Sequence, residues 1–217
     1  MKTPDYWHNK HPLTPQLYSG RPLPNGNAYD MDVRQFVWED DIELLRLIGC
    51  NNLRTQSNDE TAHRCQQFVT KMLSYVSDST LGVPEYWMFP AETCAMKKGD
   101  CEDGAILIAS LLLNALPDEH QWRVRVAAGW VDAGAGAAEG GHAYCVYCRC
   151  SDNEWIALDW CYLEDADTPV AEKTLVKDRP EYRDVWFSFN HRHAWSHVQF
   201  ELKRRVKDDI EANRIKD

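Results

Sequence analysis

The segment Ala105 to Leu113 constrains the fold more than any other, because it is apolar on nearly every face. A helix of this kind has to be enclosed by other elements, since each of its sides carries side chains that avoid water. It is too short to span a bilayer, which needs about 20 apolar residues. The chain must therefore surround this helix with further helices and strands.

A turn and a helix start directly precede this segment. Gly99 permits a turn, Asp100 is a good N-cap residue, and Asp103 follows three residues later. We expect the helix to begin at Cys101, with the sulfur near the positive end of the helix dipole, where thiol pKa values fall. Glu102 and Asp103 act in the opposite direction, because carboxylates disfavour a neighbouring negative charge. Cys101 is a candidate nucleophile; the alternative is a small buried cysteine without chemistry.

Length and composition narrow the class of protein. A chain of 217 residues with 44% hydrophobic content can form one well-filled core with appended segments. Its formal net charge of −10 disfavours nucleic acid and anionic membrane surfaces as partners. The first residues contain no apolar signal region, so we expect a cytoplasmic protein with reduced thiols. Small molecules and polypeptides remain as substrates.

Hydrophobic periodicity predicts helices first and antiparallel strands afterwards, which is typical of a single α+β domain. We interpret the chain as a proline-rich extended arm (1–37), a domain (38–192) and a charged C-terminal helix (193–217). Within the domain we expect helices over 39–48, 57–77 and from Cys101 onward, a loop over 81–98, and strands over 122–130, 142–150, 154–160 and 183–190. The stripe expected to bury the first helix is Ile42, Leu45 and Ile48.

The two middle strands should form a hairpin around residues 151–153. If Cys150 pairs with Asn153, then His142 lies diagonal to Asp159 on the same face of the hairpin. A slip of one residue would move Asp159 to the other face, so the register is a sharp prediction. A thiol acyl-transfer site needs a sulfur, an imidazole and a group that orients the imidazole. The hairpin can supply the last two; alternatively, both residues simply end strands.

The order and setting of these residues resemble the transglutaminase-like superfamily, in particular bacterial and phage transglutaminase-like cysteine peptidases. Three motifs carry the resemblance: Gly99-Asp100-Cys101-Glu102-Asp103 opening a helix, Gly141-His142-Ala143-Tyr144 opening a strand, and Leu158-Asp159 closing the next. The resemblance spans roughly Pro84 to Tyr162. It does not cover the arm, the first helix or the chain after Tyr162.

The resemblance implies a papain-like core in which the nucleophile helix packs on an antiparallel sheet of about four strands. It implies Cys101 as nucleophile, His142 as general base and then acid, and Asp159 as the group that orients His142. The expected reaction is hydrolysis of peptide, isopeptide or side-chain amide bonds in a protein or peptide, through a thioester and without a cofactor. The alternatives are a cross-linking transglutaminase with an amine acceptor, and a catalytically silent binding module.

A thioester mechanism also needs donors for the oxyanion. The backbone amide of Cys101 is the natural first donor. Relatives can place a glutamine where this chain has Met88, and methionine cannot donate a side-chain hydrogen bond to the oxyanion. We therefore expect the further oxyanion or substrate contacts to come from Tyr86, Trp87 and Gly141. The alternative for Trp87 is a place in the aromatic core.

Clusters of cysteine and histidine offer a competing interpretation as metal sites. Four cysteines have spacings that resemble a zinc site: Cys145, Cys148, Cys150 and Cys161. In a strand, however, Cys145 faces away from Cys148 and Cys150, so we predict no metal there. We interpret three histidines as solvated surface residues: His191, His193 and His197.

Overall fold

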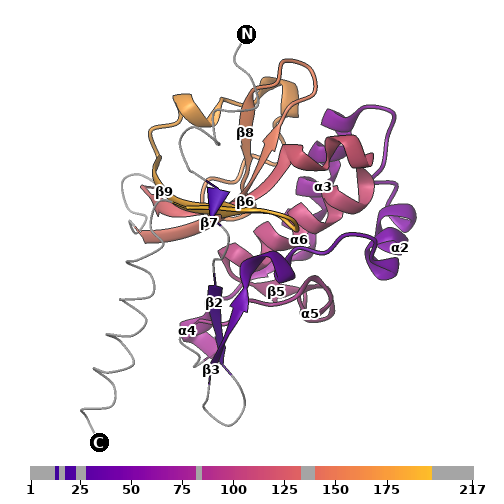
Figure 1. The fold of residues 1–217 in the computed structure, drawn as a ribbon. Coiled ribbons are helices and arrows are strands. Elements are labelled where there is room, and N and C mark those ends of the chain that lie inside the picture. Colours follow the sequence, from indigo (N-terminus) through magenta and orange to yellow (C-terminus); the bar gives the residue numbers. More distant parts are fainter. Residues whose placement is uncertain (1–12, 15–17, 23–27, 82–84, 133–139, 197–217) are drawn as a thin grey trace, which may run out of the picture.

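The structure, a computed structural model, describes residues 13–14, 18–22, 28–81, 85–132 and 140–196. Its helices are α2 (Ile42–Cys50), α3 (Asn58–Met72), α4 (Asp78–Leu81), α5 (Pro90–Met96) and α6 (Cys101–Ala115). They lie beside an antiparallel sheet of six strands, so the α+β class predicted from the sequence is confirmed (Figure 1).

The spatial order of this sheet differs from the chain order. It runs β1 (Leu13–Thr14), β10 (Ala194–Ser196), β9 (Tyr182–Phe189), β6 (Val124–Val131), β7 (Gly140–Cys148) and β8 (Trp155–Leu158). Two small pairs stand apart: antiparallel β2 (Tyr18–Pro22) with β3 (Ala28–Asp32), and parallel β4 (Ser74–Tyr75) with β5 (Lys98–Gly99). The four predicted strands are present, and short edge strands complete the sheet.

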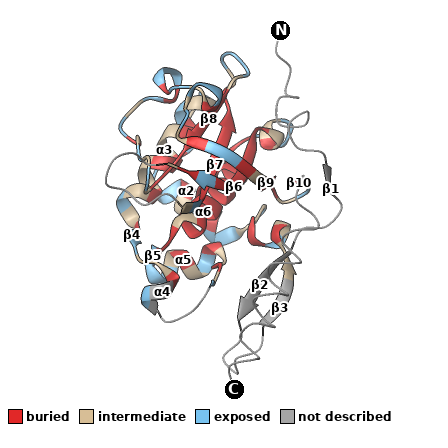
Figure 2. Cartoon of the chain, turned by 90° about the vertical axis from the view of Figure 1, so that its left-hand side faces the viewer, coloured by how far each residue is buried: buried red, intermediate tan, exposed pale blue. Residues whose placement is uncertain are grey.

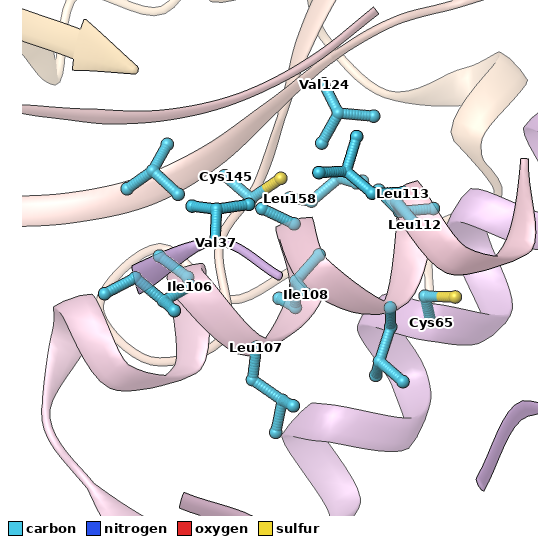
Figure 3. Packing of buried hydrophobic residues seen from close by; sticks show 14 of the residues in the cluster. Val37, Cys65, Ile106, Leu107, Ile108, Leu112, Leu113, Val124, Cys145 and Leu158 are labelled. Atoms are coloured by element: carbon cyan, nitrogen blue, oxygen red, sulfur yellow. The ribbon is translucent and has the colours of Figure 1, made fainter. Parts of the chain in front are cut away.

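Helix α6 begins at Cys101, as the sequence predicts, and all its residues from Glu102 to Ala115 are buried. It lies between the sheet and the helices α2 and α3 (Figure 1). Figure 3 shows Ile106, Leu107 and Ile108 pointing to different sides of the helix, where each meets other buried residues. Burial of each such side chain contributes roughly 1.5–3 kcal/mol, so the start of α6 is held firmly.

The hairpin register predicted from the sequence is confirmed. Cys148 pairs with Trp155 and Val146 with Ala157, the same register as the pairing of Cys150 with Asn153. Both faces of the sheet are covered, and strands β6, β7 and β8 are almost entirely buried (Figure 2). Cys145 packs into the core shared with α6, while Cys148 packs into a second core on the opposite face.

Helix α2 corrects the predicted stripe. Ile42 and Leu45 are 72% and 38% exposed, and the buried residues are Leu44 and Ile48. The segment offers two overlapping apolar stripes, and periodicity cannot tell which one faces the core. Asp41 caps the helix through its side chain, which accepts from the backbone amide of Leu44 at 2.9 Å.

Two further boundaries differ from the prediction because contacts distant in sequence override local pattern. Helix α3 ends at Met72 rather than near residue 77, since β4 leaves to pair in parallel with β5. The loop expected over 81–98 contains α5, with Pro90 at its first position. Its start is stabilised by Glu92, whose Oε2 accepts from the backbone amide of Phe89 at 2.8 Å.

The chain ends add to the same fold. Val33 and Phe36, inside the predicted arm, are buried in the main core, and the strand β1 pairs with β10. The domain boundary at residue 37 stays a prediction. The C-terminal helix was predicted over 193–217, but residues 194–196 form a strand, and 197–217 lie outside the described residues. Among the residues described, no helix has the length and apolar character needed to cross a bilayer.

Candidate active site

The structure brings His142 and Asp159 together. His142 lies in β7 and Asp159 directly follows β8, and His142 Nε2 is 2.7 Å from Asp159 Oδ2. Both side chains are only 1% exposed. The contact follows from the hairpin register, which sets the two residues diagonally on neighbouring strands.

Asp159 is a buried carboxylate surrounded by donors. The backbone amide of Cys161 donates to Oδ1 at 3.1 Å, and the hydroxyl of Tyr182 donates to Oδ2 at 3.1 Å. Burial alone would raise the pKa of Asp159, but the charge and hydrogen bond of His142, with these donors, hold it below its ordinary value. Gln66 fixes the backbone here, since its Nε2 donates to the Asp159 carbonyl at 2.6 Å. Asp159 is therefore ionised at neutral pH.

This arrangement defines the tautomer of His142. An ionised carboxylate only accepts hydrogen bonds, so Nε2 carries the proton and Nδ1 is the basic nitrogen. Nδ1 is buried and has no hydrogen-bond partner among the described residues. The imidazole thus has one nitrogen held by Asp159 and one nitrogen open to accept a proton.

Cys101 lies beside the start of β7. The backbone amide of Ala143, the residue after His142, hydrogen-bonds to the sulfur and lowers its pKa. Burial raises the pKa more strongly, and the carboxylates of Glu102 and Asp100 add to the rise, so the thiol pKa lies well above its ordinary value. The thiol donates to Glu102 Oε2 at 3.1 Å. In this state Cys101 is a protonated thiol.

Three acids gather next to the thiol. The oxygens of Asp78, Asp100 and Glu102 lie within 4.8 Å of one another, and all three residues are buried. Within the described part of the chain, Asp100 Oδ1 and Glu102 Oε1 have no hydrogen-bond partner. Burial and the neighbouring acids raise the pKa of Asp78 to about 6 and that of Glu102 well above its usual value. Hard oxygen donors that lack partners fit a calcium ion.

Asp103 has a structural part in the same region. Its Oδ1 accepts from the Met88 amide at 2.8 Å and its Oδ2 from the Asp100 amide at 3.1 Å, which joins the loop before α5 to the start of α6. Burial raises its pKa to about 8. A Cβ at Gly99 would lie 2.6 Å from Asp103 Oδ2, so the close approach requires glycine.

The residues predicted as oxyanion or substrate contacts have other partners. Trp87 Nε1 donates to Glu85 Oε1 at 2.8 Å, and the ring packs against other aromatic rings of the core: Phe36, Phe187 and Phe189. The Tyr86 hydroxyl donates to Glu92 at 3.3 Å. Gly141 lies beside the Trp186 ring. Their catalytic roles stay predictions.

The sequence gives little indication of an aromatic wall beside His142. The Tyr162 ring lies 4.7 Å from the His142 ring, and the Tyr162 hydroxyl is 3.4 Å from that of Tyr75. Both tyrosines are about two-fifths exposed. Tyr75 lies in β4, opposite Gly99, so it is also close to Cys101.

Trp160 is a second site residue without a sequence motif. Its Nε1 donates to the Cys101 carbonyl at 3.2 Å, which ties the end of the hairpin to the start of α6. A Cβ at Gly104 would lie 2.2 Å from this nitrogen. The signal that could have found this contact is Gly104 itself, a glycine inside a helix.

Cys145 and Cys148 point to opposite faces of β7, so the two side chains do not lie together. All eight cysteines lie in the described residues and all are free thiols. Cys148 Sγ is 3.6 Å from Arg123, and Cys150 Sγ is 3.5 Å from the Tyr147 hydroxyl. His191 corrects the expectation of a solvated residue, because its side chain is 5% exposed and meets Glu39 at 3.1 Å. His197 lies outside the described residues.

A cavity of about 440 Å³ lies at the other end of α6, among residues that include Arg54, Asn114 and Gln121. The rise of an α-helix puts Ala115 roughly 20 Å from Cys101. This cavity is therefore separate from the Cys101 region.

Comparison with known proteins identifies the fold. No family model matches the chain, and no curated protein matches it. Among solved structures it is similar to LapG of Legionella pneumophila, a transglutaminase-like cysteine protease. One LapG structure is 18% identical over 79% of this chain and 83% of LapG, with a TM-score of 0.53. The calcium-bound form is 19% identical over 76% and 84%, also with 0.53, and the EGTA-treated form is 19% identical over 72% and 73%, with 0.52. The chain has a transglutaminase-like fold.

Proposed function

We propose that this protein is a thiol peptidase or amidase in which Cys101 is the nucleophile, His142 the general base and then acid, and Asp159 the orienting group. One observation carries the proposal. His142 donates Nε2–H to Asp159 and has Nδ1 without a partner among the described residues, and the amide of the next residue, Ala143, hydrogen-bonds to the Cys101 sulfur. The start of α6, strand β7 and the end of β8 thus supply a thiol, an imidazole and a carboxylate, the groups that thiol acyl transfer uses, and this supports the proposal.

In the first half of the reaction, Nδ1 of His142 takes the proton of the Cys101 thiol. The thiolate attacks the carbonyl carbon of the scissile amide, and the backbone amide of Cys101 donates to the oxyanion. The imidazolium then protonates the leaving amine, which departs and leaves a thioester. The negative charge of Asp159 stabilises the imidazolium throughout.

In the second half, His142 removes a proton from water, which attacks the carbonyl carbon of the thioester. The C–S bond then breaks, a carboxylic acid leaves, and the imidazolium returns its proton to the Cys101 sulfur. An amine in place of water would give a cross-linking transglutaminase. Incubation with a fluorescent amine and denatured casein separates the two acceptors. Hydrolysis predicts new peptide ends or released ammonia without incorporation of the amine.

The acids beside Cys101 favour a calcium requirement. Asp78, Asp100 and Glu102 would hold the ion through their carboxylate oxygens, two of which lack partners among the described residues. Bound there, calcium would supply positive charge against carboxylates that otherwise disfavour a thiolate. One of the similar LapG structures is described as calcium-bound, and another as EGTA-treated.

The proposal is tested by alkylation and proteolysis. In calcium, iodoacetamide should label Cys101 faster than the exposed Cys50, and the wild-type protein should cleave denatured casein. Cys101→Ala should remove both the fast labelling and the cleavage, while the matched variant Cys50→Ala keeps both. Fast labelling or cleavage that persists in Cys101→Ala would contradict the proposal.

A silent binding module is the second candidate, and the raised pKa of Cys101 favours it. In that case the thiol would react no faster than Cys50 with or without calcium, although the protein is folded. The alkylation experiment therefore also decides between an enzyme and a binding module.

A further inference from the structure

A third donor group stands next to the His142–Asp159 pair. One donor atom each from His142, Asp159 and Cys161 lie within 4.8 Å of one another. Cys161 Sγ is 3.8 Å from Asp159 Oδ1, and the Cys161 backbone amide holds the same oxygen at 3.1 Å. Cys161 is partly exposed, while the other two residues are buried.

The chemistry of these groups is that of a zinc site. Zinc binds imidazole nitrogen at about 2.0–2.1 Å, thiolate sulfur at about 2.3 Å and carboxylate oxygen at about 2.0–2.2 Å, in tetrahedral geometry. Those bond lengths place the donor atoms of one site roughly 3.3–3.7 Å apart. His142 Nε2 and Asp159 Oδ2 are 2.7 Å apart, and the sulfur is 3.8 Å from Oδ1. Shifts of roughly 1 Å would form the site.

We propose that His142, Asp159 and Cys161 form an inhibitory zinc site, with solvent as the fourth ligand. The site uses soft and borderline donors, unlike the all-oxygen cluster of Asp78, Asp100 and Glu102. Calcium prefers the oxygen cluster, whereas thiolate and imidazole select zinc. The two ions therefore bind different donor sets, and inhibition, but not binding, rests on the proposed function.

Proton balance explains why zinc at this site stops catalysis. The Cys161 thiol loses its proton to solvent and its sulfur bonds to zinc. The lone pair of His142 Nε2 bonds to zinc, and the proton that Nε2 carried moves through solvent to Nδ1. Overall, one zinc ion enters and one proton leaves. Nδ1 becomes a donor, so it cannot accept the Cys101 proton, although zinc does not touch Cys101.

Metal binding is the direct test, because it needs no catalysis. Cobalt(II), which replaces zinc and absorbs through thiolate charge transfer, is titrated into wild type, Cys161→Ala, Cys161→Ser, Cys101→Ala and the exposed control Cys50→Ala. Saturating calcium occupies the oxygen cluster. Zinc affinities of the same proteins are measured by calorimetry, and far-ultraviolet circular dichroism checks folding.

Wild type, Cys101→Ala and Cys50→Ala should bind one equivalent and show the charge-transfer band. Cys161→Ala should lose the band and bind zinc at least tenfold more weakly, and Cys161→Ser, which keeps an oxygen donor, should lose the band and fall between them. Zinc should inhibit casein cleavage by wild type, and Cys161→Ala should need at least tenfold more zinc for the same inhibition.

Two results would overturn the proposal. One is a zinc affinity of folded Cys161→Ala and Cys161→Ser equal to that of wild type. The other is loss of the band in Cys101→Ala but not in Cys161→Ala, which would place zinc on the nucleophile. A protein that binds zinc through Cys161 but cleaves no substrate would support the site and contradict the proposed function instead.

Discussion

Buried carboxylates at the proposed active site have two opposite environments. Asp159 is met by an imidazole, a hydroxyl and backbone amides, and its pKa is lowered in spite of burial. Asp100 and Glu102 are also buried but lie close to each other and to Asp78, and two of their oxygens lack partners in the described region. Burial therefore does not by itself decide the charge of a carboxylate; the donors around it do.

The two environments suit these carboxylates to two different roles. A carboxylate with many donors is a permanent negative charge, and it can orient His142 and stabilise its protonated form. The acid cluster has fewer donors, and two of its oxygens lack partners among the described residues, so we propose that a cation completes it. Each prediction below changes either Asp159 and its donors or the acid cluster, and leaves the other unchanged.

The largest effect is expected from Asp159→Asn. The amide can donate to Nε2, which favours the tautomer with the proton on Nδ1, so the base is lost. The corresponding change in a serine protease lowers kcat about 10⁴-fold. We expect a similar loss in casein cleavage, with Asp118→Asn, on the exposed surface, as the control. A loss of less than tenfold would show that Asp159 does not orient the base.

Removal of calcium should lower stability. An ion that binds only the folded protein stabilises it by about 2.7 kcal/mol at 100 times its Kd. Chemical denaturation with calcium and with EGTA should show this difference in wild type and little of it in Asp100→Asn. An unchanged calcium effect in that variant would place the ion elsewhere.

Tyr182→Phe removes one of the hydrogen-bond donors to Asp159. A hydrogen bond to a charged group contributes about 1.5–3 kcal/mol, so we expect a loss of about 1.5 kcal/mol at neutral pH. Because the folded pKa of Asp159 is lowered, its stabilisation is present above the unfolded pKa of about 3.9 and is lost as the pH falls through the folded pKa. The difference between wild type and variant should therefore shrink below about pH 4 in denaturation curves.

Tyr147→Phe is the matched control, because it removes a hydroxyl that donates to Asp59 at 2.9 Å, away from the catalytic pair. It should cost stability without lowering the rate of cleavage. A lower rate of cleavage in Tyr147→Phe would show that it is not a neutral control.

The smallest effect is expected from Glu102→Gln. We expect calcium to raise the alkylation rate of Cys101 in wild type about tenfold, the effect of one pKa unit on thiolate population. The variant lacks a calcium ligand, so its rate of Cys101 alkylation should not change when calcium is added. Glu119→Gln, on the exposed surface, should respond like wild type. A calcium response that survives in Glu102→Gln would exclude this residue as a ligand.

Local patterns were sufficient for the parts of the site that depend on one element. Gly99 to Asp103 predicted the start of α6, and the alternation of the hairpin predicted its register. Local patterns failed where the outcome depends on packing against a segment that is distant in the chain. Helix α2 offers two apolar stripes, and only packing against α6 selects Leu44 and Ile48.

The acid cluster and the aromatic wall could not be predicted for the same reason. Asp78 and Tyr75 approach Cys101 because β4 pairs in parallel with β5, a contact that no local pattern encodes. Tyr182 reaches Asp159 from another strand, 23 residues along the chain. These residues belong to the site through topology alone.

The bond from Trp160 to the Cys101 carbonyl has a consequence for motion. Trp160 directly follows Asp159, and its indole donates to the backbone carbonyl of Cys101. Any separation of the hairpin from α6 must therefore break this hydrogen bond. The absence of a side chain at Gly104 leaves space for the ring, and a methyl group there would clash with it. The indole proton is thus a natural reporter: its exchange with deuterated solvent measures how often the two halves of the catalytic machinery come apart.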